Sequence, residues 1–325
     1  MDRFKMISQK TLQRIVERQG RFEWGNKYLP GIFAIPGEAP KGSRVSRLNS
    51  RKLGRTLHLL STPERVFTQL ALFNPHVFDI HEQKMLYPGQ HLNPLNGHPL
   101  ATGANLKPVL GTLAIATRIG FDHAKVVVED ANGQRRWIPH PYLGDLLLYL
   151  KGEDGNPLAV NWTIKLSESD FGERGRGRVK TLLQQRRDQE HIKLRNLLEE
   201  EYYLSAGIRT FKLSMDAIDP VVVANLDLLY GSHDLLIDLD KGLLDDYCNE
   251  IEEVSNLGHP VAPVAIKYGQ KWGRRDLFLA KIYQEIWDRK LKVNLFEPIL
   301  IDHPLNVGGR DVLETYDTLF KGLLA

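Results

Sequence analysis

An aspartate and a lysine lie where two adjacent buried strands would bring them together. Residues 146–150 and 158–164 are apolar runs separated by the turn signal Asp154-Gly155, which predicts two neighbouring antiparallel strands. A pair centred on Gly155 puts Asp145 opposite Lys165 at the edge of the sheet. Phosphodiester hydrolysis uses this combination, because carboxylates hold the Mg²⁺ that activates water and a lysine orients or helps to deprotonate the nucleophile. An ordinary salt bridge is the alternative interpretation.

The predicted pairing also assigns side chains to the two faces of the sheet. Side chains alternate along a strand, so residues two apart share a face. The face of Asp145 and Lys165 would carry Leu147, Tyr149, Asn161 and Thr163, and the opposite face would carry Val160, Trp162 and Ile164.

Another carboxylate is predicted in the first turn of a helix further upstream. Ser61-Thr62-Pro63 is an N-cap signal with a proline in the first turn, and apolar residues follow at helical spacing. Glu64 therefore lies in the first turn of this helix. At this position a glutamate favours the positive end of the helix, an effect of about 0.3–1 kcal/mol.

The remaining patterns predict a mixture of helices and strands. Helices are expected at 11–19, 109–119, 179–204 and 220–230, strands at 77–83 and 209–213, and a hairpin over 124–137 that turns at Asn132-Gly133. Beyond about residue 216 the chain is mostly helical. A helical segment from Asp276 followed by the strand-like residues 292–301 is the pattern of a winged helix, and a purely structural helical domain is the alternative.

The composition is that of an ordinary globular protein. The chain has 325 residues, 42% hydrophobic and 26% charged, enough for roughly two domains. Its single cysteine, Cys248, excludes a disulfide framework and a multi-cysteine zinc site, so a bound metal would be held by oxygen. The first residues lack the apolar core of a signal peptide, and no apolar stretch reaches the roughly 20 residues that span a bilayer. We therefore expect a cytoplasmic protein that does not enter a membrane.

Basic residues are concentrated in three segments, although the net charge is only +3. These are residues 41–55, 174–187 and 267–275. Such patches could follow a phosphate backbone, and each could also be solvated surface.

Residues 42–88 resemble the TnsA endonuclease subunits of heteromeric bacterial transposases nearly position for position. In that family a basic strand leads to His-x-Leu-Ser-x-x-Glu, here His58 to Glu64, then a helix and Asp-Ile-Arg-Glu-Gln, here Asp79 to Gln83. The resemblance covers most of residues 26–230, with a weaker echo near the C-terminus. Its other matching positions are residues 26–30, Asp145, Lys165, residues 199–203, Gly207-Ile208 and residues 219–222.

The resemblance implies a fold for each part of the chain. We expect an α/β restriction-endonuclease-like domain at residues 1–215 and a mostly α, winged-helix-like domain at residues 216–325, with the boundary placed to within about 15 residues.

The resemblance also implies a set of site residues. Glu64 and Asp145 match the family's metal-binding carboxylates, and Lys165 matches its catalytic lysine. The departure is Thr163, where restriction nucleases have an acid and TnsA proteins commonly have glutamine. The Ile164 carbonyl can add an oxygen ligand, and Glu199 is expected to replace the charge missing at Thr163, so one or two Mg²⁺ ions, or Mn²⁺, are expected.

Two further features stand near these residues. The segment 171–187 is longer and more basic than the family's, which suggests a DNA-facing loop. Its candidate DNA-binding residues are Arg174, Arg176, Arg178, Lys180, Arg186 and Arg187. His140, which precedes Asp145, is a further candidate for the site.

The implied function is hydrolysis of the non-transferred strand at the 5′ ends of a transposon. Implied partners are transposon-end DNA, a DDE transposase of TnsB type and an AAA+ ATPase of TnsC type. Two alternatives stay open, a DNA-binding regulator with an inactive nuclease fold and a stand-alone restriction or repair nuclease.

Overall fold

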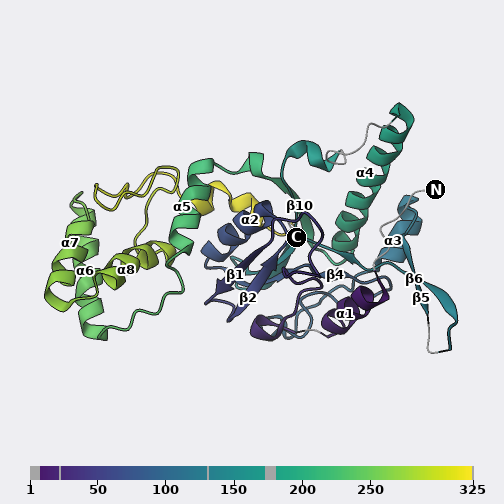
Figure 1. Ribbon diagram of the computed structural model, residues 1–325, viewed down its shortest axis with the longest axis horizontal. Coiled ribbons are helices and arrows are strands. Elements are labelled where there is room, and N and C mark those ends of the chain that lie inside the picture. Colours follow the sequence, from purple (N-terminus) through teal and green to yellow (C-terminus); the bar gives the residue numbers. More distant parts are fainter. Residues whose placement is uncertain (1–7, 22, 130–131, 173–180, 324–325) are drawn as a thin grey trace.

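The computed structural model describes residues 8–21, 23–129, 132–172 and 181–323 (Figure 1). Its first half contains α1 (Gln9–Gln19), β1 (Ser46–Ser50), β2 (Arg55–Leu59), α2 (Thr62–Phe73), β3 (Val77–Glu82), β4 (Met85–Leu86), α3 (Thr112–Ile119), β5 (Lys125–Glu129), β6 (Arg135–Pro139) and β7 (Tyr142–Leu143). Then follow β8 (Leu146–Lys151), β9 (Pro157–Lys165), α4 (Leu182–Ser205), β10 (Arg209–Ser214), α5 (Pro220–Tyr230), α6 (Lys241–Asn256), α7 (Ala262–Trp272), α8 (Arg275–Trp287) and α9 (Val312–Thr315). Short 3₁₀ turns lie at Gly25–Lys27, Pro99–Ala101, Glu168–Phe171, Met215–Ala217 and Asp317–Phe320. The expected mixed α/β content is confirmed.

A four-stranded sheet in the order β10-β9-β8-β3 is the centre of the molecule. β8 pairs antiparallel with both β3 and β9, while β10, which follows the long helix α4, pairs parallel with β9. One face packs on α2 and α5 through a core that includes Leu148, Val160 and Trp162. The other face packs on α4, where Leu147 and Tyr149 belong to a second core. The face assignment made from the alternation is therefore confirmed.

The helices that surround the sheet begin at residues suited to cap them. Ser61 accepts the main-chain N–H of Glu64 at the start of α2, and Asp219 accepts that of Val221 at the start of α5. Thr181 and Gln184 form a reciprocal capping box at the start of α4. Because α4 is capped at Thr181, its first turns hold a helix without packing on the body, and Figure 1 shows this end projecting from the molecule.

The β8–β9 register differs from the predicted one by two residues. Leu146 pairs with Trp162 and Lys151 with Pro157, so the hairpin is centred on Asp154 and not on Gly155. Gly155 has φ 80° and donates its N–H to the Gly152 carbonyl, which places it at the left-handed end of the turn. Extending the pairing by one residue puts Asp145 opposite Thr163. The prediction that Asp145 is opposite Lys165 was wrong, but a shift of two residues leaves each side chain on its predicted face.

Two other predicted elements differ in their extent. The helix expected from residue 109 begins at Thr112, because Val109 exchanges main-chain hydrogen bonds with His91. The strand expected at 292–301 is absent from the described part of the chain, where Val293 makes only an isolated bridge with Val307. The apolar residues that made this segment resemble a strand pack in the core instead, since Leu295 and Ile299 are buried.

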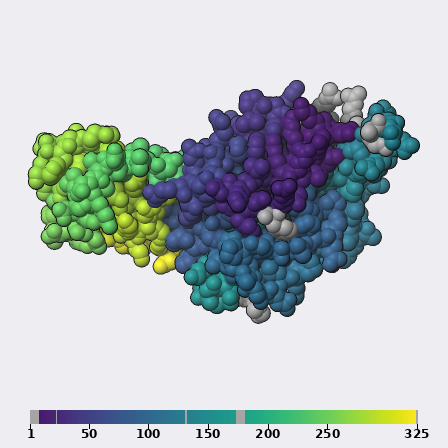
Figure 2. All heavy atoms as spheres, turned by 90° about the horizontal axis from the view of Figure 1, so that it is seen from below, coloured from purple at the N-terminus to yellow at the C-terminus, as the bar shows by residue number. Residues whose placement is uncertain are grey.

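Helices α6, α7 and α8 form a lobe at one end of the molecule, seen also as the narrower projection in Figure 2. α5 packs on both α2 and α8, and one hydrophobic core runs from the sheet through α5 into the lobe. The chain then returns to the sheet, where the indole of Trp162 donates to the Leu319 carbonyl (2.9 Å) and packs on Phe320. The boundary between residues 215 and 216 stays a prediction, and the core is continuous across it. Within the described residues, no helix is long and apolar enough to cross a membrane.

Candidate active site

Asp145 and Lys165 meet at the edge of the sheet where β8 begins and β9 ends. Asp145 Oδ2 accepts the main-chain N–H of Ile164 (2.7 Å) and lies 3.4 Å from Lys165 Nζ. The same ammonium donates to the Ile164 carbonyl (3.1 Å). The negative charge of Asp145 raises the pKa of Lys165, so this side chain is a cation at neutral pH. Both side chains reach solvent, with exposed fractions of 23% for Asp145 and 34% for Lys165.

Glu64 lies in the first turn of α2, with only 6% of its surface exposed. Three donors hold its carboxylate: Oε1 accepts the hydroxyl of Ser61 (2.8 Å), and Oε2 accepts the Leu60 N–H (2.9 Å) and the Gln83 amide (3.1 Å). Burial and the charge of Asp145 raise the pKa of Glu64 to about 7. Burial is the larger cause of this raised pKa, and the like charge of Asp145 adds to it.

Thr163 and Glu199 are joined to each other on the α4 face of the sheet. Thr163 Oγ1 donates to Glu199 Oε1 (3.0 Å), which also accepts the amide of Asn161 (3.2 Å). Arg195 forms an ion pair with the second oxygen of Glu199 (3.1 Å). Glu199 is thus buried and fully engaged in binding α4 to β9.

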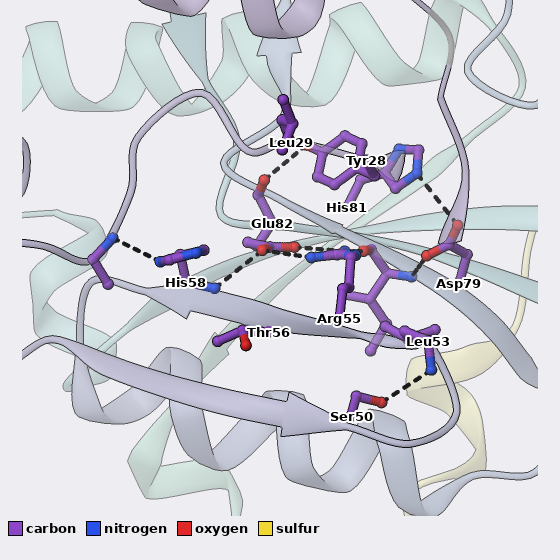
Figure 3. Close-up of polar contacts among 12 residues, drawn as sticks. Tyr28, Leu29, Ser50, Leu53, Arg55, Thr56, His58, Asp79, His81 and Glu82 are labelled. Carbon is purple, nitrogen blue, oxygen red and sulfur yellow. Dashed lines mark hydrogen bonds and ion pairs between the residues drawn. The ribbon is translucent and has the colours of Figure 1, made fainter. Parts of the chain in front are cut away.

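In the motif Asp79 to Gln83, the first four residues make structural contacts and the last one contacts Glu64. The Glu82 carboxylate accepts hydrogen bonds from both terminal nitrogens of Arg55 (each 2.8 Å) and from the main-chain N–H of His58 (3.0 Å), as Figure 3 shows. Tyr28 donates to the Glu82 carbonyl and stacks on His81, and Asp79 accepts the Gly25 N–H. These buried contacts fix the end of β3. The next residue, Gln83, turns toward Glu64 and is a site residue that the sequence interpretation did not single out, although it closes the motif.

The donor atoms at this edge suit a hard divalent cation. Glu64, Asp145 and the Ile164 carbonyl offer oxygen only, the ligand type that Mg²⁺ and Mn²⁺ prefer. Among the described residues, no three His, Cys, Asp or Glu side chains form a cluster that could hold a metal. Glu64 and Asp145 are the two carboxylates that the resemblance assigns to a metal. Mg²⁺ usually keeps several waters, so two carboxylates and one carbonyl would suffice as protein ligands.

The remaining predicted residues lie at different places. Arg174, Arg176, Arg178 and Lys180 lie outside the described residues. Arg186 and Arg187 are both exposed near the start of α4. His140 packs edge-on against Tyr142, and burial lowers its pKa to about 4.

Some cations of the basic segments make contacts within the fold, and others are exposed. In residues 41–55, Lys52 donates to the carbonyls of Leu72 and Asn74, and Arg55 is buried on Glu82, so both cations stabilise the fold. In residues 267–275, Lys267 pairs with Glu250, while Arg275 is exposed. Only part of each of these two segments is thus available to a partner.

In comparisons with known proteins, no protein-family model matches the chain. No curated protein matches it either.

Proposed function

We propose that this chain is a metal-dependent DNA endonuclease of TnsA type, which hydrolyses the non-transferred strand at the 5′ ends of a transposon. The observation that carries the proposal is that Asp145 pairs with Lys165 at one edge of the sheet and is linked to Glu64 through the hydrogen bonds of Gln83. Glu64, Asp145 and Lys165 come from α2, the start of β8 and the end of β9, and are separated by up to about a hundred positions in the sequence, so local structure alone does not bring them together.

The arrangement of the sheet supports a restriction-endonuclease-like fold for residues 1–215. An antiparallel pair, β8 and β9, carries the aspartate and the lysine, and α4 leads to the parallel strand β10. For residues 216–325 we propose a winged-helix-like unit, in which α6 to α8 form the helical part and the Val293–Val307 bridge takes the place of the wing.

The residues at the edge of the sheet divide the chemistry between them. A divalent cation held by Glu64, Asp145 and the Ile164 carbonyl would supply a hydroxide-like nucleophile at neutral pH. Lys165, kept protonated by Asp145, is suited to orient the attacking water or the phosphate and to stabilise negative charge. A lysine with a raised pKa is poorly suited to remove a proton from water, so we assign it the orienting role.

Thr163 and Glu199 support this site from the side of α4. Because Glu199 is already neutralised by Arg195, we propose that it holds α4 on the strand that bears Lys165. The basic segment 174–187 and the first turns of α4 would then contact phosphates beside the cut.

The proposed partners follow from the resemblance to TnsA. The cut position would be set by a DDE transposase bound to the transposon ends, with an AAA+ ATPase relaying target selection, and the reaction would take place in the cytoplasm. The chain alone should therefore bind DNA weakly.

The test is nicking of a plasmid that carries transposon ends, with Mg²⁺ or Mn²⁺ and with or without the two partner proteins. Wild-type chain should nick only with metal and partners, and Asp145→Ala should not nick. Asp122→Ala, which removes an exposed aspartate elsewhere, is the matched control. Nicking by Asp145→Ala would exclude the assigned site, and robust specific cutting without partners would favour a stand-alone nuclease.

A further inference from the structure

Gln83 has an uncommon backbone conformation at the end of β3. Its φ is 51°, in the left-handed region that residues other than glycine seldom adopt, and it is buried. Such a conformation persists only where the surroundings enforce it, and it is often found at functional sites. At Gln83, three hydrogen bonds hold the backbone in this conformation.

Two of the three hydrogen bonds of Gln83 connect the two candidate metal-binding residues. Its main-chain N–H donates to the Asp145 carbonyl (3.1 Å). Its side-chain amide donates to Oε2 of Glu64 (3.1 Å). Its carbonyl accepts the N–H of Gly31 (3.1 Å), a third bond that holds the Gln83 backbone in place. One residue thus fixes the backbone before β8 and the carboxylate on α2 relative to each other.

The hydrogen bond from the Gln83 side chain orients the Glu64 carboxylate differently from its other two hydrogen bonds. Ser61 and Leu60 belong to the same helix start as Glu64, so their bonds orient the carboxylate only with respect to α2. Gln83 is the one donor to this carboxylate, among the described residues, that comes from the sheet. Its amide therefore sets where the carboxylate stands relative to Asp145.

Gly31 packs so tightly against the Gln83 backbone that it leaves no room for a side chain. A Cβ at Gly31 would stand 2.9 Å from the Gln83 carbonyl oxygen and 2.9 Å from a methyl carbon of Leu143. A side chain there would push the Gln83 backbone away, because a main-chain oxygen cannot rotate aside as a methyl can. Gly31 is far from both carboxylates in sequence, and the atoms nearest to its Cβ position belong to Gln83 and Leu143.

We propose that Gln83 is a positioning residue that holds Glu64 beside Asp145 and thereby sets the affinity of this edge for a divalent cation. The inference rests on the proposed function in taking this edge as the metal site. Residues that orient metal ligands by hydrogen bonding typically change metal affinity or activity by about 10- to 100-fold when they are replaced.

The test is calorimetric titration of the full chain with Mn²⁺, without DNA. Gln83→Met keeps the length and removes the donor, and it should weaken Mn²⁺ binding by about 10-fold or more. Gln69→Met is the matched control, because Gln69 is also a buried glutamine whose amide donates to a carboxylate, that of Asp227 (2.9 Å), away from the site. Equal Mn²⁺ affinity in wild type and Gln83→Met would overturn the proposal, as would an equal loss in Gln69→Met.

A second route leaves every polar side chain in place. Gly31→Ala should weaken Mn²⁺ binding in the same direction, whereas Gly89→Ala, where a Cβ would meet no atom within 4 Å, should bind as wild type does. Melting temperatures measured alongside identify a variant that fails to fold, in which case the other variant decides. Unchanged Mn²⁺ affinity in a folded Gly31→Ala protein would count against the proposal.

Nicking assays on the same proteins separate this inference from the proposed function. If Gln83→Met loses Mn²⁺ affinity but wild type never nicks DNA, the positioning role stands and the nuclease assignment fails. If wild type nicks DNA and Gln83→Met binds Mn²⁺ equally well, the nuclease assignment stands and the positioning role fails. A wild-type chain that binds no Mn²⁺ overturns the positioning role.

Discussion

The hydroxyl of Thr163 donates to the carboxylate of Glu199 across a distance of 3.0 Å. The polar atom of this threonine is thus used on a carboxylate of helix α4. Asn161 and Arg195 hold the same carboxylate. Glu199 is therefore part of a buried hydrogen-bond network with Thr163, and the two residues should not act independently.

Replacement of Thr163 tests this network. Thr163→Val keeps the shape and removes one donor, so single-turnover nicking should fall by about 10-fold, or about 1.4 kcal/mol of barrier. Glu199→Ala should cost less in the Thr163→Val background than in wild type, because their shared bond is already lost. Additive effects on the nicking rate and on the free energy of unfolding would contradict the coupling, and inactivity of Thr163→Val would indicate a direct metal ligand.

Replacement of Lys165 should separate chemistry from stability. The ion pair with Asp145 is partly exposed, and such pairs contribute at most about 1 kcal/mol, so Lys165→Ala should keep nearly the melting temperature of wild type. Its nicking rate should fall by about 10²- to 10⁴-fold. Lys125→Ala, at an exposed lysine on β5, is the control for removing a positive charge. A large loss of stability in Lys165→Ala would mean that the pair is structural.

The raised pKa of Glu64 predicts a pH dependence of stability in metal-free buffer. Its pKa rises from an ordinary 4.5 to about 7, so its contribution to stability is complete below pH 4.5 and is lost as the pH rises through 7. Glu64→Gln avoids this loss and should exceed wild type in unfolding free energy at pH 8 by up to about 3 kcal/mol. The difference should shrink toward pH 5. Urea unfolding in EDTA at both pH values measures it, and parallel pH profiles would contradict the prediction.

Arg186 and Arg187 should contribute to DNA binding through phosphates. If each contacts one phosphate, the double alanine variant should reduce the slope of log K against log salt by about 2. The control is Lys267→Ala with Arg274→Ala, which removes the same charge at exposed residues already paired with Glu250 and Asp276. Equal slopes for wild type and the Arg186/Arg187 variant would exclude these residues from the interface.

The sequence predicted the elements best where a cap and a periodic stripe agree. The bounds of α5 are those expected, since Asp219 caps the helix and Pro220 begins it. The faces of β8 and β9 were predicted because alternation depends only on neighbouring residues. The register was not, because it depends on whether Gly155 stands in the middle or at the left-handed end of its turn, and both positions favour glycine.

The position of Gln83 could not be predicted from its neighbours. Its role depends on Glu64, Asp145 and Gly31, which are brought to it by three different segments of the chain. Likewise, charge alone could not distinguish Arg55, buried on Glu82, from the exposed Arg275. Tertiary packing decides which cations of a basic segment stay available.

The return of the chain end to the sheet has a consequence for how the molecule unfolds. Residues 319 and 320 cover Trp162, the fully buried indole of the central strand β9, while α5 connects that strand's core to the lobe. A break in the lobe would therefore expose an apolar surface of the sheet as well. The lobe and the sheet should lose their structure in one cooperative transition, and hydrogen exchange in α8 and in β9 should report the same opening free energy.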